Sequence, residues 1–205
     1  HNIFIENGYS HIIPFNHKDL NLWRNSLNGG LRWKKGNINF TGGIDDLGYD
    51  QNTDEIVVIE YKSQAKNELI TKENYLNDIY HESYKVQLDF YTFLLRKMRF
   101  KVANKAFFVV VNAIEKNKFD SKLHFDQYLF DYNTSTDWIE EKIIELLNII
   151  NSYEFPESNL SCENCARDKA TVEEYVERDE ELKTKIIEDF GYDNQVFEEI
   201  WEREL

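Results

Sequence analysis

The stretch that most constrains how this chain folds is residues 41–63, TGGIDDLGYDQNTDEIVVIEYKS. Its apolar residues 57–59 predict a short buried strand, and this strand runs directly into Glu60, Tyr61 and Lys62. Because side chains alternate along a strand, Glu60 and Lys62 should leave on one face while Tyr61 leaves on the other. The sequence therefore predicts a carboxylate and an ammonium side by side at the end of a core strand.

A second carboxylate lies upstream of this strand. Residues 42–45 (GGID) form another short extended piece, and the polar residues 48–54 (GYDQNTD) predict a turn between the two. If the chain folds here as an antiparallel hairpin, Asp45 returns beside Glu60. Two carboxylates and Lys62 would form a site for a hard divalent cation, with a positive group available to a water or a phosphate.

Three short motifs follow one another in a specific order. They are Gly-x-Ile-Asp at residues 42–45, a strand that ends in EYKS at residues 60–63, and Gln87-x-x-x-Tyr91 on a later helix. An acid-x-lysine pair alone is common, but Asp45 lies 15 residues before the strand's glutamate and the Gln-x-x-x-Tyr helix comes next. This combination resembles the PD-(D/E)XK nuclease superfamily, and within it the RecB-type branch that includes the CRISPR adaptation nucleases.

The resemblance implies a metal-dependent nuclease that acts on DNA. Asp45 and Glu60 would hold Mg²⁺ or Mn²⁺, and the backbone carbonyl of Tyr61 would be a natural further ligand. The metal would polarise the scissile phosphate and lower the pKa of a bound water. Lys62 would orient that water or neutralise charge that develops on the phosphorane.

Gln87 and Tyr91 lie four residues apart and therefore on one side of the predicted helix 83–98. The resemblance implies that Gln87 reaches towards Lys62 or a substrate phosphate while Tyr91 supports it. On periodicity alone, Tyr91 could equally be a core aromatic and Gln87 a surface amide. The position of the pair after Glu-x-Lys favours the functional interpretation.

The resemblance also implies a third metal ligand from the N-terminal region, which the sequence does not place. His11 and His17 are candidates because histidine commonly binds metals, but neither lies in a convincing helix. Glu6 is a weaker candidate. Asp46 competes with Asp45, since alternation lets only one of the two face the site, and the Gly-x-Ile-Asp frame favours Asp45.

The wider pattern predicts an α/β fold, a restriction-endonuclease-like mixed β-sheet flanked by helices with a C-terminal acidic helical extension. We expect a nuclease-like domain at residues 1–170 and the extension, packed on the core or a partner, at 171–205. The expected elements, in order, are an irregular lead-in 1–20 with an edge strand at 3–5, a short helix from Asp19, a strand 31–39, the hairpin 41–63, a long polar loop 64–81, a helix 83–98, strands 106–113 and 123–132, a helix from Ser135 or Thr136 to about 152, and acidic helices from Thr171 that break at Gly191. The loop 64–81 would be either a lid or a surface excursion without function.

The net charge of −14 argues against a nucleic-acid enzyme until its distribution is considered. Residues 173–205 hold 13 acidic and four basic side chains, so most of the acidity belongs to the tail. The acidic helices could cap the core, bind a protein partner or screen the substrate groove. With no membrane-length apolar run and no signal-peptide pattern, we expect a cytoplasmic protein. Because the sequence begins with His1 rather than Met, we expect it to be a fragment or a processed form.

The two cysteines, Cys162 and Cys165, form a Cys-x-x-Cys pair. Two are too few for a four-iron cluster or a four-cysteine zinc site built by this chain alone. RecB-type relatives often close their fold with such a cluster, so three alternatives stay open: a remnant or two free thiols, a zinc site completed by a histidine, and an iron-sulfur cluster with ligands upstream. A redox disulfide is not expected, because nothing nearby resembles a thioredoxin βαβ unit.

A second hypothesis is a nucleic-acid-binding or assembly subunit that keeps the nuclease fold and no longer cuts. The acidic tail and the incomplete cysteine set favour it. Asp45, Glu60 and Lys62 argue against it, because few roles other than catalysis would retain three charges near a core.

Overall fold

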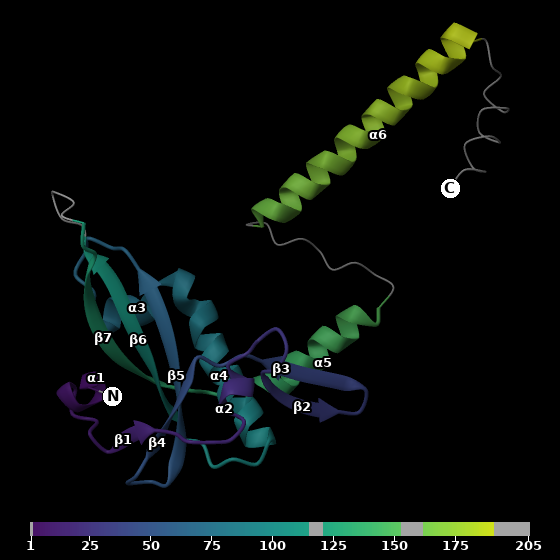
Figure 1. Cartoon of the computed structure of the whole chain (residues 1–205). Coiled ribbons are helices and arrows are strands. Elements are labelled where there is room, and N and C mark those ends of the chain that lie inside the picture. Colours follow the sequence, from purple (N-terminus) through teal and green to yellow (C-terminus); the bar gives the residue numbers. More distant parts are fainter. Residues whose placement is uncertain (1, 115–120, 153–161, 191–205) are drawn as a thin grey trace. The chain divides into compact units, whose positions relative to one another are not determined.

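A computed structural model describes residues 2–114, 121–152 and 162–190 of the chain (Figure 1). It divides into two compact units, His1–Leu146 and Leu147–Leu205, and each is described by itself. The first unit holds the sheet and the residues that the sequence assigns to the nuclease-like metal site.

The first unit is built on a five-stranded mixed sheet in the order β1-β4-β5-β6-β7. The strands are β1 (Ile12–Pro14), β4 (Asp46–Asp50), β5 (Glu55–Gln64), β6 (Lys105–Ile114) and β7 (His124–Asn133). Only the β5–β6 pair is parallel, and a parallel pair needs a crossover connection. That crossover consists of α3 (Lys72–Asn77), the 3₁₀ helix η1 (Ile79–His81) and α4 (Glu82–Lys97). The predicted mixed sheet flanked by helices is confirmed.

Strand alternation divides the unit into two apolar cores, one on each face of the sheet. Val58 and Phe108 pack on the face that α4 covers, and Figure 1 shows α4 running alongside β5. Val57 packs on the opposite face with Phe4 of α1 (Asn2–Glu6). Because Glu60 follows Val58 by two residues, it leaves the strand on the α4 side.

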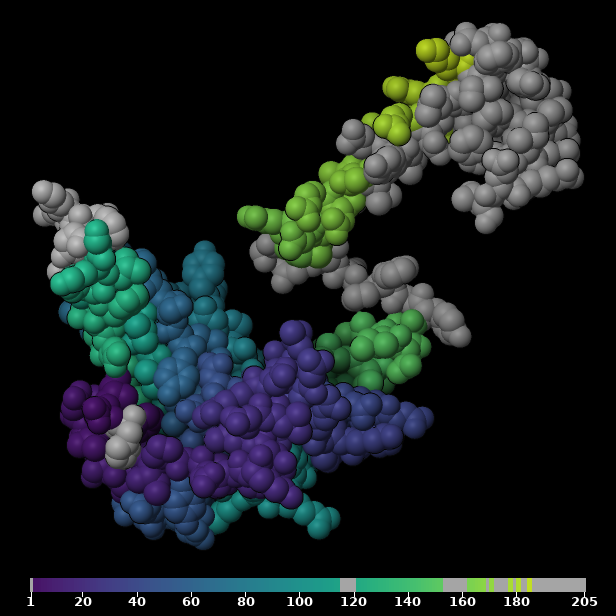
Figure 2. Space-filling view, in the orientation of Figure 1, coloured from purple at the N-terminus to yellow at the C-terminus, as the bar shows by residue number. Residues whose placement is uncertain are grey.

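A separate two-stranded hairpin, β2 (Leu31–Lys35) and β3 (Ile38–Gly42), replaces the single predicted strand 31–39. That prediction was wrong because Gly36 adopts a φ of 60° and reverses the chain. Trp33 stacks on Phe40 with ring centroids 5.0 Å apart and meets Phe93 of α4 edge-on at 5.7 Å. The hairpin projects from the body of the unit in the space-filling view (Figure 2).

The N-terminal predictions also need correction. Residues 3–5, expected as an edge strand, lie in α1, where the helix buries Phe4 against Phe107 at a ring distance of 5.1 Å. The edge strand is β1 instead, paired with β4. The short helix expected from Asp19 is present as α2 (Leu20–Trp23).

The hairpin of residues 41–63 forms, but its first strand is shifted. β4 pairs antiparallel with β5 as expected, yet it begins at Asp46 and contains residues 48–50, which were predicted as a turn. Gly48 belongs to the strand because a Cβ there would lie 2.8 Å from Ile12 Cγ2, so glycine lets β1 approach. The turn is shorter and includes Asp54, with a φ of 57°.

Residues 64–81 are not a loop throughout, because they contain α3 and η1. The Thr71 hydroxyl caps α3 by accepting a hydrogen bond from the backbone N–H of Asn74 at 3.1 Å, and the Asp78 carboxylate caps η1. The helix 83–98 and the strands 106–113 and 123–132 are confirmed to within one residue. The last helix of this region, α5 (Ile139–Ile150), begins later than the predicted cap.

The second unit contains α6 (Glu163–Phe190), which begins well before the predicted Thr171. The expected break at Gly191 and most apolar side chains of the acidic helices lie outside the described residues. In the described part of the chain, no helix combines the length and the apolar character needed to span a membrane.

Candidate active site

Glu60 and Lys62 lie together at the end of β5, on the face towards α4. Glu60 is 4% exposed, and its Oε1 accepts a hydrogen bond from Lys62 Nζ at 2.7 Å. Its other oxygen, Oε2, is buried and has no hydrogen-bond partner among the described residues. A buried carboxylate oxygen without a partner is unfavourable, so this atom indicates a ligand that the chain does not supply.

The electrostatics of Glu60 agree with this geometry. Burial raises the pKa of Glu60, the hydrogen bond from Lys62 opposes that rise, and the negative charge of Asp45 adds to it. The two carboxylates are therefore close enough to repel each other. A cation beside them would stabilise the ionised form of both.

Asp45 occupies a bend just before β4 and is exposed. Its Oδ2 accepts a hydrogen bond from the backbone N–H of Tyr61 at 2.8 Å. The antiparallel pairing of β4 with β5 thus brings Asp45 to the end of β5, next to the backbone between Glu60 and Lys62.

Arg24, at the end of α2, holds the bend that carries Asp45. Its Nε donates to the backbone carbonyl of Asp45 at 3.1 Å, and its Nη2 forms an ion pair with Asp46. Asp46 is therefore occupied by a guanidinium. No pattern in the sequence marks Arg24 as part of the site, because its partners are fixed by the tertiary fold and not by any local spacing.

α4 supplies the third side of the site. Gln87 Oε1 accepts a hydrogen bond from Lys62 Nζ at 2.7 Å, and the same ammonium lies 4.1 Å from the centroid of the Tyr84 ring. The Lys62 ammonium is thus held by a carboxylate, an amide and an aromatic face. No signal in the sequence distinguishes Tyr84 from an ordinary core aromatic of this helix.

Tyr91 lies one turn further along α4 and is 8% exposed. Burial, with the charges of Glu60 and Asp45, raises the pKa of Tyr91 to about 12, and the interaction with Gln87 opposes that rise. The phenol is therefore within electrostatic reach of both carboxylates. It packs against Gly42, where a Cβ would lie 2.8 Å from Tyr91 Cε1.

The N-terminal candidates for a third metal ligand have other partners or lie apart. His11 pairs with Asp50 at 3.9 Å, and the His17 ring stacks on Trp23 at 4.5 Å. Glu6 is exposed at the end of α1. Among residues 2–114, 121–152 and 162–190, no three His, Cys, Asp or Glu side chains are grouped so that they could hold a metal ion.

The residues present still fit a divalent cation held partly by solvent or substrate. Asp45 and Glu60 supply two hard oxygen donors, and Glu60 Oε2 is available because no described group bonds to it. Mg²⁺ commonly binds through one or two carboxylates and fills its remaining positions with water and phosphate oxygens. The Tyr61 carbonyl as a further ligand stays a prediction.

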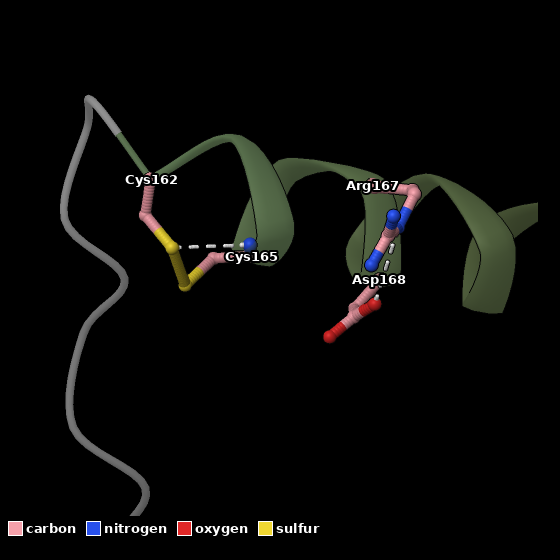
Figure 3. The surroundings of a disulfide bond; sticks show 4 residues. All are labelled: Cys162, Cys165, Arg167 and Asp168. Carbon is pink, nitrogen blue, oxygen red and sulfur yellow. Dashed lines mark hydrogen bonds and ion pairs between the residues drawn. A yellow bond between two sulfur atoms is a disulfide. The ribbon is translucent and has the colours of Figure 1, made fainter. Parts of the chain in front are cut away.

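Cys162 and Cys165 are joined by a disulfide at the start of α6 (Figure 3). This differs from the expectation that no disulfide would form. Two cysteines three apart at a helix start lie on one side, and their Cα atoms are 5.3 Å apart, within the usual range for disulfides. In this form neither sulfur is a thiolate, so neither is a zinc or cluster ligand.

Comparison with known protein families gives a match to most of the chain. The family model described as the PD-(D/E)XK nuclease superfamily matches residues 6–170 of this chain. A search of the curated proteins found no match, and a search of the solved structures also found none. The matched region contains the sheet, α4 and all five candidate site residues, Asp45, Glu60, Lys62, Gln87 and Tyr91.

Proposed function

Because this chain belongs to the PD-(D/E)XK nuclease superfamily, whose members are generally nucleases that use Mg²⁺ or Mn²⁺, we propose that it hydrolyses phosphodiester bonds of DNA. The observation that carries the proposal is the convergence of Asp45, Glu60 and Lys62 at the end of β5. We further propose that it acts as a RecB-type enzyme. Cleavage of end-labelled DNA tests whether its activity is that of an exonuclease.

In this proposal, Asp45 and Glu60 hold the cation, with the Tyr61 carbonyl as a further ligand. When bound, Mg²⁺ or Mn²⁺ supplies Lewis acidity that polarises the scissile phosphate and acidifies a water. The bend held by Arg24 orients Asp45, since the guanidinium fixes both the Asp45 carbonyl and the Asp46 carboxylate. Asp46 itself is a positioning residue.

Lys62 supplies the positive charge of the site. Its ammonium donates hydrogen bonds to Glu60 and Gln87, which keep it oriented there. When a substrate phosphate approaches, this ammonium can stabilise the charge that develops on the phosphorus oxygens or orient the attacking water. Tyr91 supports Gln87 from the helix and holds its proton because its pKa is raised.

The test is cleavage of end-labelled and internally labelled DNA, single-stranded and duplex, with Mg²⁺, Mn²⁺ or EDTA. We expect metal-dependent cleavage by the wild type and a loss of about 100-fold or more in Lys62→Ala, because removal of one preorganised charge at a reacting centre typically has this effect. Lys142→Ala is the matched control, since Lys142 is an exposed lysine of α5 that pairs with Glu145. It should cut at the wild-type rate.

A second candidate function is a non-cutting nucleic-acid-binding or assembly subunit. It is favoured by one observation, that the described residues offer no group of three acids or histidines for a metal. Wild-type protein that binds DNA and does not cut it with either metal would support this candidate. Equal cutting by the wild type and Lys62→Ala would contradict the catalytic role of Lys62.

A further inference from the structure

The β2–β3 hairpin is a basic region of an acidic protein. Residues 25–44, which include the whole hairpin, contain no aspartate or glutamate, although the chain has 38 acidic side chains and a net charge of −14. Arg32, Lys34 and Lys35 all lie on β2 within this stretch. Because like charges gathered on one projecting element create a local positive potential, the hairpin can attract an anionic partner (Figure 2).

One face of the hairpin is used for packing. Trp33 and Phe40 lie opposite each other in the register of the two strands and stack, and Trp33 also meets Phe93 of α4 edge-on. Leu31, on the same face, is fully buried. A two-stranded hairpin is only marginally stable by itself, so this packing on α4 is what holds the hairpin in place.

The opposite face of the hairpin, which we call the outer face, carries two cations. Because side chains alternate along a strand, Arg32 and Lys34 leave β2 on the side away from α4, and both are exposed. Arg32 Nε donates a hydrogen bond to the backbone carbonyl of Gly29 at 3.1 Å, which orients the guanidinium. Within the described part of the chain, neither Arg32 nor Lys34 forms an ion pair. Their charges are therefore available to a partner.

Lys35 differs from its neighbour Lys34. Alternation places it on the packed side of β2, together with Trp33. The pKa of Glu140 on α5 is lowered by its hydrogen bond from Lys97 and also by the charge of Lys35. Lys35 thus has an acidic neighbour within electrostatic reach, and the outer face is defined by Arg32 and Lys34 alone.

The outer face begins close to the candidate active site. Gly42, the last residue of β3, packs against Tyr91, and Asp45 follows three residues later. The chain from Thr41 to Asp45 spans at most about 14 Å, and Arg32 lies one strand spacing, about 5 Å, from Thr41. Since a duplex rises about 3.4 Å per base pair, roughly six base pairs would reach from Asp45 to Arg32.

We propose that the outer face of the hairpin binds the phosphate backbone of DNA a few nucleotides from the scissile bond, through Arg32 and Lys34. The proposal rests on the proposed nuclease function and deepens it, because it names the element that holds the substrate. A guanidinium and an ammonium form charge-assisted hydrogen bonds with phosphate oxygens. Contacts to phosphates fix the position of DNA without reading its bases, so the hairpin would hold DNA of any sequence.

The test is fluorescence anisotropy of labelled DNA 20-mers, single-stranded and duplex, over a salt series in EDTA, where metal-dependent cleavage does not interfere. The variants are Lys34→Ala, Arg32→Gln and the double variant, compared on the form of DNA that the wild type binds more tightly. Lys35→Ala is the matched control, because it removes the same charge from the adjacent position on the packed side. Thermal melting of each variant establishes that it is folded.

We expect each single substitution to weaken binding about threefold and the double variant to weaken it about tenfold, by the same factor for two unrelated sequences. Each single substitution should also reduce the slope of log affinity against log salt by about 0.7 for single strands or about 0.9 for duplex, because one phosphate contact fewer releases fewer counterions. A role of Lys34 in stability alone would not change this slope. Lys35→Ala should keep the wild-type slope.

An unchanged slope in folded Lys34→Ala would overturn the proposal, and so would an equal loss in Lys35→Ala or the absence of DNA binding by the wild type. If Arg32→Gln is unfolded because it loses its bond to Gly29, Lys34→Ala decides. Failure of this inference is distinguishable from failure of the proposed function. A protein that cuts DNA with Mg²⁺ and whose hairpin variants bind as the wild type does loses only the hairpin site. One whose binding depends on the hairpin and which cuts with neither metal loses only the nuclease assignment.

Discussion

Glu60 combines deep burial with one carboxylate oxygen that no described group satisfies. If a divalent cation binds there, it binds the folded state alone and raises the melting temperature. At ten times Kd the gain is about 1.4 kcal/mol, or about 3–6 °C for a chain of this size. We expect Mg²⁺ or Mn²⁺ to produce this rise in the wild type and not in Glu60→Gln, measured by differential scanning fluorimetry.

The control for this experiment is Glu140→Gln. Glu140 is an exposed acid of α5 that pairs with Lys97, away from the cation site. Its melting temperature should rise with the metal as the wild type's does. A metal-dependent rise that survives in Glu60→Gln would show that the cation binds elsewhere.

Gly42 allows the close approach of β3 to α4 at Tyr91. A Cβ at Gly42 would lie 2.8 Å and 3.1 Å from two carbons of the Tyr91 ring, so Gly42→Ala must displace that ring. We expect a loss of about 1–3 kcal/mol in the free energy of unfolding, from denaturant titration, together with slower cleavage. Thr41→Ala, at the exposed neighbouring position on β3, should leave both unchanged.

Among individual residues, the sequence predicted the placement of those side chains that local spacing along a strand or a helix determines. Alternation places Glu60 and Lys62 on one face, and helical spacing places Gln87 and Tyr91 on one side of α4. The role of Arg24 as a positioning residue was not predicted, because its bonds to Asp45 and Asp46 depend on how α2 packs against the start of β4.

Asp89 connects α4 with β7 and the start of α5. Its Oδ1 accepts from the Ser135 backbone N–H at 2.9 Å, and its Oδ2 accepts from Trp138 Nε1 at 3.1 Å and Tyr132 Oη at 3.5 Å. Asp89→Ala leaves these donors without their acceptor. We expect unfolding free energy to fall by roughly 3 kcal/mol, whereas Asp126→Ala, on the exposed face of β7, should change it little.

The same variant should show a pH signature. Burial is the main cause that raises the pKa of Asp89, against the hydrogen bonds that it accepts. The folded state therefore holds a proton on Asp89 more tightly than the unfolded chain does, and wild-type stability gains from this as the pH falls from neutral. Because Asp89→Ala lacks that gain, its stability deficit should widen on acidification. A deficit that narrows would contradict this assignment.

Elements were predictable where the apolar pattern is long. The strands β6 and β7 and the helix α4 each have at least ten residues of consistent pattern, and their predicted bounds were close. The short elements were not, since their form depends on partners: α1 is helical where it buries Phe4, and β4 takes in Gly48 because β1 needs the space.

The two hydrophobic cores consist of buried residues between Phe4 and Ile139. A chain that ends after Ser152 should therefore keep the melting temperature of the full chain to within about 2 °C. It should also bind DNA more tightly at low salt, because the strongly acidic residues 173–205 are removed. Anisotropy across a salt series measures this effect. A truncated chain that fails to fold would show that the extension belongs to the core.

At the scale of the whole molecule, the family was recognisable because the motifs at residues 42–45, 60–63 and 87–91 preserve their order. The disulfide was not, because it does not depend on the nuclease pattern. The domain boundary at residue 170 stays a prediction.

The parallel β5–β6 pair has a consequence for the chain as it leaves the ribosome. Asp45, Glu60 and Lys62 are synthesised early, but β6, the strand that flanks β5, follows only after the long crossover, which includes the helix that carries Gln87. Contacts between residues so far apart in the chain form late in folding. A nascent polypeptide would thus carry Asp45, Glu60 and Lys62 before β6 and Gln87 are in place, so the proposed site would be complete only once the whole unit has been made.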